Sequence, residues 1–192
     1  MRLIILGAGG YGRTVADVAA QTGEYSKIFF LDDNSAAPDV AGKCEEFERF
    51  RDGQTAFYPA FGNNESRLAW LSRLREAGCA IPTIIHPTAY VSPTAQIESG
   101  TAVLPHAVVN TNCTVKSGCI VNCGAIVDHG CVLEEGVHVC LGAIVKAENR
   151  IPRCMKIEAG EVMQNRTYPC DGGESYGIIP EQWQTETADH RG

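Results

Sequence analysis

The sequence predicts a chain of two parts, an α/β domain followed by a parallel β-helix. Three observations support this fold class. Residues 1–85 alternate short apolar strands with helical segments, residues 89–145 carry only five charged groups, and aliphatic residues recur at every sixth position from Val91 onward. The change in charge density predicts a boundary near residues 85–87. We therefore divide the chain into residues 1–85, residues 86–163 and an irregular tail over residues 164–192.

Composition narrows the class of protein. The chain has 192 residues, of which 44% are hydrophobic and 20% charged, as expected of a globular protein. The net charge of −7 argues against a protein that binds the nucleic-acid backbone, because such proteins usually carry a basic face. We find no apolar run of the roughly 18 residues that a membrane span needs. The first residues, MRLIILGAGG, lack the pattern of a signal peptide, so we expect a cytoplasmic protein.

The first part alternates strands and helices. Apolar runs predict strands at residues 2–6, 27–31, 56–61 and 81–85, and apolar positions on one face predict helices at residues 14–22 and 65–77. Because strands separated by helices pair in parallel, this order predicts a parallel sheet with helices packed on it.

The second part follows a period of six. Thirteen aliphatic residues stand in unbroken register, at Val91, Ile97, Val103, Val109, Val115, Val121, Val127, Leu133, Val139, Val145, Ile151, Ile157 and Met163. Two positions before most of them stands a small residue, as at Ala107, Cys113 and Ala125. Neither a helix nor an ordinary strand has this period, whereas a β-helix places one aliphatic side chain inward from each short strand.

The nine cysteines fit this register. Cys113, Cys119 and Cys131 fall on the series of small residues, where we expect them to fill buried corners as small hydrophobic side chains. No C-x-x-C pair occurs, which argues against a zinc ribbon or a thioredoxin-type motif.

A glycine-rich turn follows the first strand. Gly7, Gly9 and Gly12 form the pattern G-x-G-x-x-G before a predicted helix, the context in which a turn can bind phosphate. Asp32 and Asp33 follow the second strand and Gly62 the third, so all three loops should face one crevice. A turn without a ligand, and a capping or turn role for the two aspartates, stay open as alternatives. A dinucleotide is disfavoured, because the domain is only half of a typical two-unit fold.

Two histidines stand out in the repeat. His129 lies two positions after inward-facing Val127, so it should be exposed on a rigid scaffold and could act as a general base. His138 lies nine residues on, half a coil away, where the pair could hold two ends of a reacting system. Two ordinary surface histidines are the alternative. We see no ligand cluster that predicts a metal site.

The chain resembles the bacterial hexapeptide-repeat sugar acetyltransferases, specifically the sialic-acid O-acetyltransferase and UDP-amino-sugar N-acetyltransferase subfamily. The resembling segments are ILGAGGYG (5–12), FLDDN (30–34), FGNNESR (61–67), IHPTAYVSPTA (85–95) and VDHGCVLEEGVHVCLGA (127–143). They occur in one order with matching spacing.

The resemblance implies a Rossmann-like N-terminal domain, a left-handed β-helix, a homotrimer and an active site between neighbouring β-helices. It implies acetyl-CoA as donor and a nucleotide-linked, UDP-type sugar as acceptor. By the same resemblance His129 is the catalytic general base and His138 lies near the acetyl-CoA thioester. The sugar nucleotide would contact a set of residues in the first domain: Gly9, Gly10, Tyr11, Asp32, Asp33 and Gly62.

We expect direct transfer of the acetyl group. His129 would remove a proton from the sugar amine or hydroxyl, and a backbone N–H near Gly142, with His138, would stabilise the oxyanion at the acetyl-CoA site. The inward register of Cys131 argues against a thiol mechanism.

Two departures from the family pattern stand out. Gly130 stands where amino-sugar relatives have an acidic residue after the histidine, and Asp128 and Glu134 are the candidates for that role. The repeat also stops early, and Lys146, Arg150 and Lys156 are the candidates for contacts with the CoA phosphates. A sialic-acid or amino-acid acceptor, or a catalytically idle sugar-nucleotide-binding trimer, remain alternatives.

Overall fold

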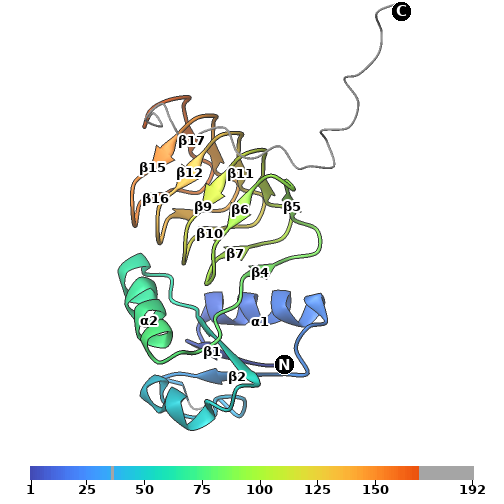
Figure 1. The fold of residues 1–192 in the computed structure, drawn as a ribbon, viewed down its shortest axis with the longest axis vertical. Helices are drawn as coiled ribbons and strands as arrows, with labels where there is room; N and C mark the ends of the chain where they lie inside the picture. Colours follow the sequence, from blue (N-terminus) through green and yellow to red (C-terminus); the bar gives the residue numbers. More distant parts are fainter. Residues whose placement is uncertain (36, 169–192) are drawn as a thin grey trace, which may run out of the picture.

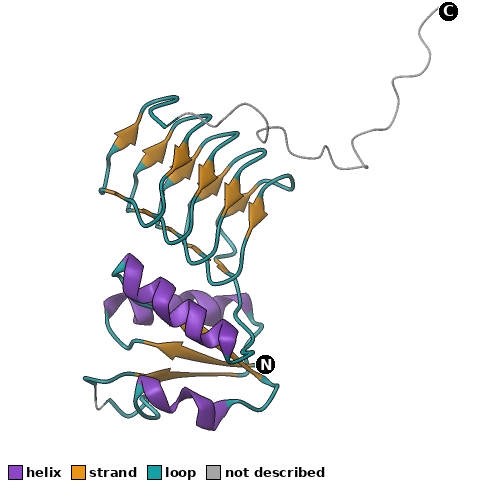
Figure 2. Ribbon diagram, turned by 60° about the vertical axis from the view of Figure 1, so that its left-hand side comes forward, coloured by secondary structure: helices purple, strands orange, loops and turns teal. Residues whose placement is uncertain are grey.

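The computed structural model describes residues 1–35 and 37–168 of the chain. An α/β domain and a β-helix stand end to end (Figure 1), and helix, strand and loop are distinguished in Figure 2. This confirms the predicted fold class. Of the predicted tail, residues 169–192 lie outside the described residues.

The α/β domain is built on a parallel three-stranded sheet of order β2-β1-β3. Its strands are β1 (Arg2–Leu6), β2 (Lys27–Leu31) and β3 (Thr55–Pro59), and its helices are α1 (Gly10–Thr22), α2 (Asn64–Glu76) and the 3₁₀ helix η1 (Cys44–Phe50). The sequence patterns predicted the three strands and both α-helices to within a few residues. The 3₁₀ helix was not predicted.

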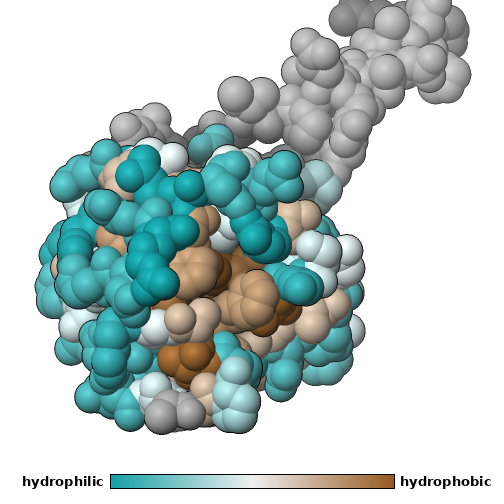
Figure 3. All heavy atoms as spheres, turned by 90° about the horizontal axis from the view of Figure 1, so that it is seen from below, coloured by the Kyte–Doolittle hydropathy of each residue, from teal (hydrophilic) through white to brown (hydrophobic). Residues whose placement is uncertain are grey.

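Alternation along β1 determines how the helices cover the sheet. Leu3 and Ile5 face α1, whereas Ile4 and Leu6 face η1 and α2, and all four are buried. Successive side chains of a strand point to opposite faces, so a strand that is apolar throughout is buried on both sides. Seen from the end of the α/β domain, apolar side chains occupy the centre of the surface and hydrophilic ones surround them (Figure 3).

The β-helix consists of two-residue strands stacked in parallel. They are β4 (Ile84–Ile85), β5 (Tyr90–Val91), β6 (Gln96–Ile97), β7 (Ala102–Val103), β8 (Val108–Val109), β9 (Thr114–Val115), β10 (Ile120–Val121), β11 (Ile126–Val127), β12 (Val132–Leu133), β13 (His138–Val139), β14 (Ile144–Val145), β15 (Arg150–Ile151), β16 (Lys156–Ile157) and β17 (Val162–Met163).

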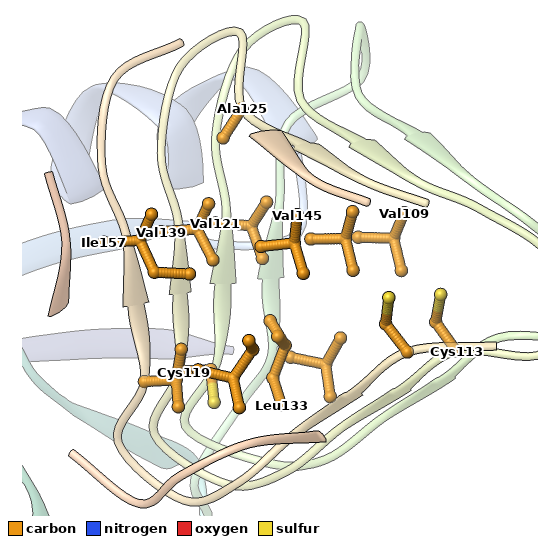
Figure 4. Packing of buried hydrophobic residues seen from close by; sticks show 14 of the residues in the cluster. Val109, Cys113, Cys119, Val121, Ala125, Leu133, Val139, Val145 and Ile157 are labelled. Carbon is orange, nitrogen blue, oxygen red and sulfur yellow. The ribbon is translucent and has the colours of Figure 1, made fainter. Parts of the chain in front are cut away.

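These strands form the three sides of a prism. The first side has the order β16-β13-β10-β7-β4, the second β17-β14-β11-β8-β5 and the third β15-β12-β9-β6. The chain passes over the sides in that order, and each residue pairs with the residue 18 positions along, as Val103, Val121 and Val139 do. The predicted aliphatic series fills the centre of the prism (Figure 4).

The cysteine prediction is confirmed for the three residues on the small-residue series. Cys113, Cys119 and Cys131 are at most 1% exposed and lie in the core of the β-helix. The Cys131 thiol donates to the Lys146 carbonyl at 3.2 Å, so it faces the interior and is not available as a nucleophile.

The fourth predicted strand belongs to the other part of the molecule. Residues 81–85 do not extend the sheet of the α/β domain; Ile84–Ile85 forms β4, which pairs with β7 as the first strand of the β-helix. At the β3 edge of the sheet, an isolated bridge joins Ala56 to Ala80.

The first side of the prism packs against the α/β domain. Ile84, Ala102 and Ile120 face outward from this side and share a buried cluster with Val15 and Val18 of α1. His86 joins the same junction by a contact of 3.1 Å between its Nε2 and Gln21 Oε1. Within the described part of the chain, neither α-helix is long and apolar enough to cross a lipid bilayer.

Candidate active site

Three loops meet at the carboxyl edge of the sheet, one after each strand. Gly9 and Gly10 follow β1, and Gly62 follows β3; a Cβ atom at any of these three positions would meet no atom within 4 Å. Gly12 is different, because its Cβ would lie 1.9 Å from the Gly7 carbonyl oxygen. Gly12 therefore closes the turn, whereas Gly9, Gly10 and Gly62 border open space.

Asp32 fastens two of these loops together. One carboxylate oxygen accepts the Ala8 N–H at 2.7 Å, and the other accepts the N–H groups of Asn34 and Ser35 at 2.7 and 2.8 Å. These backbone donors, the Ala8 N–H above all, lower the pKa of Asp32. Asp32 therefore has the turn-stabilising role that the sequence analysis left open as an alternative.

Asp33 is exposed, and one of its carboxylate oxygens accepts the Cys44 N–H at 3.0 Å. The two aspartates therefore differ, since Asp32 is engaged on both oxygens by the loops themselves. A sugar-binding role for either remains a prediction.

Tyr11 points from the glycine-rich turn into the base of the site. Its hydroxyl lies 2.9 Å from that of Tyr58 on β3, and burial raises the pKa of Tyr11 to about 12. The Tyr11 hydroxyl therefore stays neutral and is held within the protein.

Two cations at this edge were missed by the sequence reasoning. Arg13 in the first turns of α1 donates to the Ala8 carbonyl, lies over the Phe30 ring and pairs with Asp39. Lys43 donates to the Asp33 carbonyl oxygen. The position of Arg13, directly after the glycine-rich turn, could have identified it from the sequence. Lys43 lies in a segment that has no recognisable motif or periodicity.

His129 lies in the turn between β11 and β12 and is exposed, as predicted. Its backbone N–H donates to Asp128 Oδ1 at 2.7 Å, and the same oxygen accepts Asn110 Nδ2 at 3.3 Å. Glu134 forms ion pairs with Lys116 and Arg150. Glu134 is thus engaged by other residues, whereas Asp128 contacts His129 through the backbone N–H of His129.

An acidic residue does lie one coil beyond Gly130. Glu148 stacks on it, with its Cγ 3.6 Å from where a Gly130 Cβ would be, and its N–H donates to the His129 carbonyl oxygen at 3.1 Å. Its carboxylate pairs with Arg166.

His138 is the first residue of β13 and is half-buried on the outer face of the first side. Asn122 Nδ2 lies 3.1 Å from its Nε2. Burial, with the positive charges of Arg67 and Lys156, lowers the pKa of His138 to about 4, so the imidazole is neutral near pH 7. Its Nδ1 is buried and has no hydrogen-bond partner among the described residues.

The tautomer of His138 follows from these contacts. The Oδ1 atom of Asn122 accepts the Cys123 N–H at 2.8 Å, which turns the NH₂ group of Asn122 toward His138. Nε2 must then accept, so the single proton of the neutral ring is on Nδ1. Nδ1–H is therefore a buried donor without a hydrogen-bond partner among the described residues.

The two histidines do not meet within one chain. His129 lies at the edge between the second and third sides, and His138 on the first side. In a three-sided prism that edge is opposite the first side, and the aliphatic core fills the space between. The two histidines of one chain therefore cannot act on one substrate together, and their pairing stays a prediction for a site between neighbouring chains.

Gly142 does not supply the predicted donor. It is exposed in the turn between β13 and β14, but its N–H donates to the Cys123 carbonyl at 3.0 Å. Because that donor is already used in the coil, Gly142 N–H cannot stabilise an oxyanion. A Cβ there would meet nothing within 4 Å, so a contact with acetyl-CoA stays a prediction.

The three basic residues proposed for the CoA phosphates lie on different sides. Lys146 follows β14 of the second side, Arg150 is in β15 of the third and Lys156 in β16 of the first. They contact Gln164, Glu134 and Glu158 respectively. One chain cannot gather them around a single phosphate group. The described residues contain no group of three or more His, Cys, Asp or Glu side chains that could hold a metal ion.

Comparison with known proteins covers both parts of the chain. Residues 2–74 match the family model of the PglD N-terminal domain. The acetyltransferase domain of PglB from Neisseria gonorrhoeae FA1090 is 36% identical, with a TM-score of 0.83 over 86% of this chain and 83% of that one. The same domain has been solved in complex with acetyl coenzyme A.

More distant structures share the fold. PerB from Caulobacter crescentus, in complex with CoA and GDP-perosamine, is 19% identical with a TM-score of 0.66, over 88% of this chain and 92% of that one. WeeI from Acinetobacter baumannii AYE is 17% identical with a TM-score of 0.53, over 84% and 95%.

Proposed function

The chain belongs to the family of hexapeptide-repeat sugar acetyltransferases, and from that premise we propose that it transfers an acetyl group from acetyl-CoA to an amine or hydroxyl of a nucleotide-linked sugar, with a UDP-linked sugar as the class to test first. The observation that carries the proposal is a pair of histidines with different chemistry. His129 is exposed at a turn, and His138 is a half-buried neutral ring with a donor at Nδ1. The acetyl coenzyme A complex of the PglB domain supports the choice of donor.

In the proposed reaction His129 accepts the proton of the acceptor amine or hydroxyl as that atom attacks the thioester carbonyl. The new bond joins the acceptor nitrogen or oxygen to the acetyl carbon. His138 Nδ1–H donates to the oxyanion that develops. The carbon–sulfur bond then breaks, and the CoA thiolate takes up a proton on release.

The active site is proposed to be shared between chains. The sheet edge with its loops and His138 lie on one side of a chain, and His129 on the far edge, so His129 of one chain would serve the sugar held by the next. An outward row of large apolar residues on the second side supports association, with Tyr90, Ile126 and Val162 each 37% to 54% exposed. We propose a homotrimer, a closed ring in which every site has this composition.

The open edge of the α/β domain is the proposed sugar-nucleotide site. Because Gly9, Gly10 and Gly62 have no side chain and border open space, the ligand can approach the backbone there. Asp33 is exposed on the neighbouring loop. Arg13 and Lys43 add positive charge for a diphosphate. Tyr11 and Asp32 would shape the site through the contacts that they make within the protein.

The free cysteines favour a protein that resides in a reducing compartment. Eight cysteines of the described residues are free thiols, as expected in the cytoplasm. We therefore propose a cytoplasmic enzyme.

A transfer assay tests the proposed function. Acetyl-CoA is incubated with nucleotide-linked amino sugars and free sugars, and the CoA thiol released is measured with product mass. Acetylated sugar nucleotide is the expected product. Sugar-nucleotide binding without CoA release would favour the catalytically idle trimer, a reading that Gly130 supports because it replaces the acidic residue of the relatives. Acetylation of a free sugar alone would favour a sialic-acid or other acceptor.

Subunit mixing tests the shared site. His129→Ala and His138→Ala should each lose activity. Mixed oligomers, identified by two affinity tags, should regain activity, because some of their sites combine an intact His129 with an intact His138 from the neighbouring chain. Mixed oligomers that form and stay inactive would place both histidines of a site in one chain.

A further inference from the structure

Arg67 on α2 is a fully buried cation at the junction of the two parts of the molecule, with 0% of its surface exposed. Its guanidinium donates to four neutral oxygens: Nε to Gly118 O at 2.7 Å, Nη1 to Phe61 O at 2.8 Å, and Nη2 to Asn64 Oδ1 at 2.8 Å and Gly136 O at 2.9 Å. A buried charge is costly unless its hydrogen bonds are satisfied. An apolar residue would suffice if this position only held the two domains together. The four hydrogen bonds of Arg67 therefore suggest a further role.

The bonded atoms lie next to the two parts of the proposed site. Phe61 directly precedes Gly62 in the loop after β3. Gly136 stands two residues before His138, and Gly118 is the equivalent position one coil earlier. One guanidinium therefore connects the third loop of the sugar-nucleotide edge to the turn that leads into β13.

Neighbouring contacts hold α2 in this register. Cβ atoms at Gly118 and Gly136 would lie 2.8 Å from Leu68, and one at Gly100 would lie 2.6 Å from Leu71. The glycines let the helix approach the corner of the β-helix. Asn64 Nδ2 donates to the Cys154 carbonyl at 2.8 Å, one coil further on. The N-terminal part of α2 thus contacts carbonyls of three successive coils, at residues 118, 136 and 154.

We propose that Arg67 is a positioning residue for the transfer reaction, one that fixes the loop at residues 61–63 relative to the coil that carries His138. The inference rests on the proposed function. Acetyl transfer needs the acceptor atom and the thioester within about 3.5 Å of each other, and these are held by different parts of the chain. The planar guanidinium suits the task because its donors point in several fixed directions, whereas a lysine has one nitrogen.

The test compares Arg67→Met with Leu71→Ala. Both side chains lie on α2, both are buried, and Leu71 packs on the β-helix corner without bonding to the loop. Steady-state kinetics are measured well below the melting temperature of each variant. Arg67→Met should lower kcat about 10- to 100-fold with KM for acetyl-CoA unchanged, whereas Leu71→Ala should keep kcat within about threefold despite its loss of stability. Arg67→Lys, which retains the charge, serves if Arg67→Met does not fold, and should lower kcat by an intermediate factor.

Hydrogen exchange gives a readout that needs no activity. Loss of the guanidinium should speed amide exchange in segments 61–64 and 136–139 together, whereas Leu71→Ala should affect residues around 100 and 118. A kcat loss no greater than that of Leu71→Ala, or faster exchange in one segment only, overturns the proposal. If the wild-type protein transfers no acetyl group to any sugar, the proposed function fails, and the exchange result alone decides whether Arg67 connects the two segments.

Discussion

The side-chain amide of Asn122 lies 3.1 Å from Nε2 of His138 and leaves Nδ1 as the protonated nitrogen of a neutral ring. Asn122 precedes His138 by 16 residues in the sequence. It lies directly beside His138 in space, because β10 and β13 are neighbours on the first side. An asparagine that is itself held by the Cys123 N–H thus determines which nitrogen can donate to a ligand.

Asn122→Asp should reverse this arrangement. A carboxylate accepts where the amide donated, so the His138 proton should move to Nε2 or the ring should become charged. The neutral ring protonated on Nε2 lacks the preorganised Nδ1–H donor that we propose for the oxyanion, whereas the charged ring keeps it, so kcat measured at a pH where the ring is neutral should fall about 10²-fold. Imidazole ¹⁵N shifts report the tautomer, and kcat the consequence.

An exposed asparagine provides the control for this change. Asn165→Asp adds the same charge at an exposed position of the last described turn and should leave both the shifts and kcat unchanged. A tautomer switch with normal kcat would show that Nδ1–H does not stabilise the transition state.

The lowered pKa of His138 makes a prediction about acid stability. The folded ring titrates at about 4 and the unfolded ring at about 6.5, so between these values the unfolded chain binds a proton that the folded chain does not. The free energy of unfolding should therefore fall as pH decreases from about 6.5 to about 4. Urea unfolding at several pH values measures the slope, and His138→Asn should reduce it in that window. An unchanged slope in His138→Asn would mean that other groups cause the acid sensitivity.

Two glycines of the β-helix test the docking of α2. Gly136 and Gly124 both have positive φ, of 71° and 66°, so alanine at either is strained by about 1 kcal/mol. Only at Gly136 would the new Cβ meet Leu68, at 2.8 Å, whereas nothing lies within 4 Å at Gly124. Gly136→Ala should cost about 1–3 kcal/mol more than Gly124→Ala, since crowding adds to the strain. Equal losses in chemical unfolding would show that α2 does not pack on this corner.

The hexad register was enough to predict the β-helix and its core. Neither a helix nor an ordinary strand has a period of six, and in a β-helix each aliphatic position of the hexad faces inward. The strand at residues 81–85 was assigned to the wrong sheet because a two-residue strand carries no pattern that names its partner. His138 follows His129 by nine positions, which is half of an 18-residue coil, and in a coil of three sides half a turn leads to the opposite face.

The contacts of Arg67 and Asn122 lay beyond sequence reasoning for another reason. Arg67 reaches carbonyls 51 and 69 residues away, and an arginine in a helix with a polar face reads as exposed. Asn122 contacts His138 16 residues on, nearly one coil, which becomes apparent only once strands are paired. Both depend on how α2 and the first side of the prism are stacked, which local patterns do not encode.

The two aspartates of the second loop should separate a structural role from a binding role. In Asp32→Asn one oxygen becomes an NH₂ group that cannot accept from Ala8 N–H or from the N–H groups of Asn34 and Ser35, so at least one donor loses its partner. This should cost about 1–2 kcal/mol of stability. Asp33→Asn keeps an oxygen for the Cys44 N–H and should leave the melting temperature nearly unchanged. A raised KM for the sugar nucleotide in Asp33→Asn would then report a lost contact with the ligand, because its fold is intact. If Asp33→Asn changes neither stability nor KM, the exposed carboxylate does not bind the sugar nucleotide, and the acidic pair of this loop serves the turn alone.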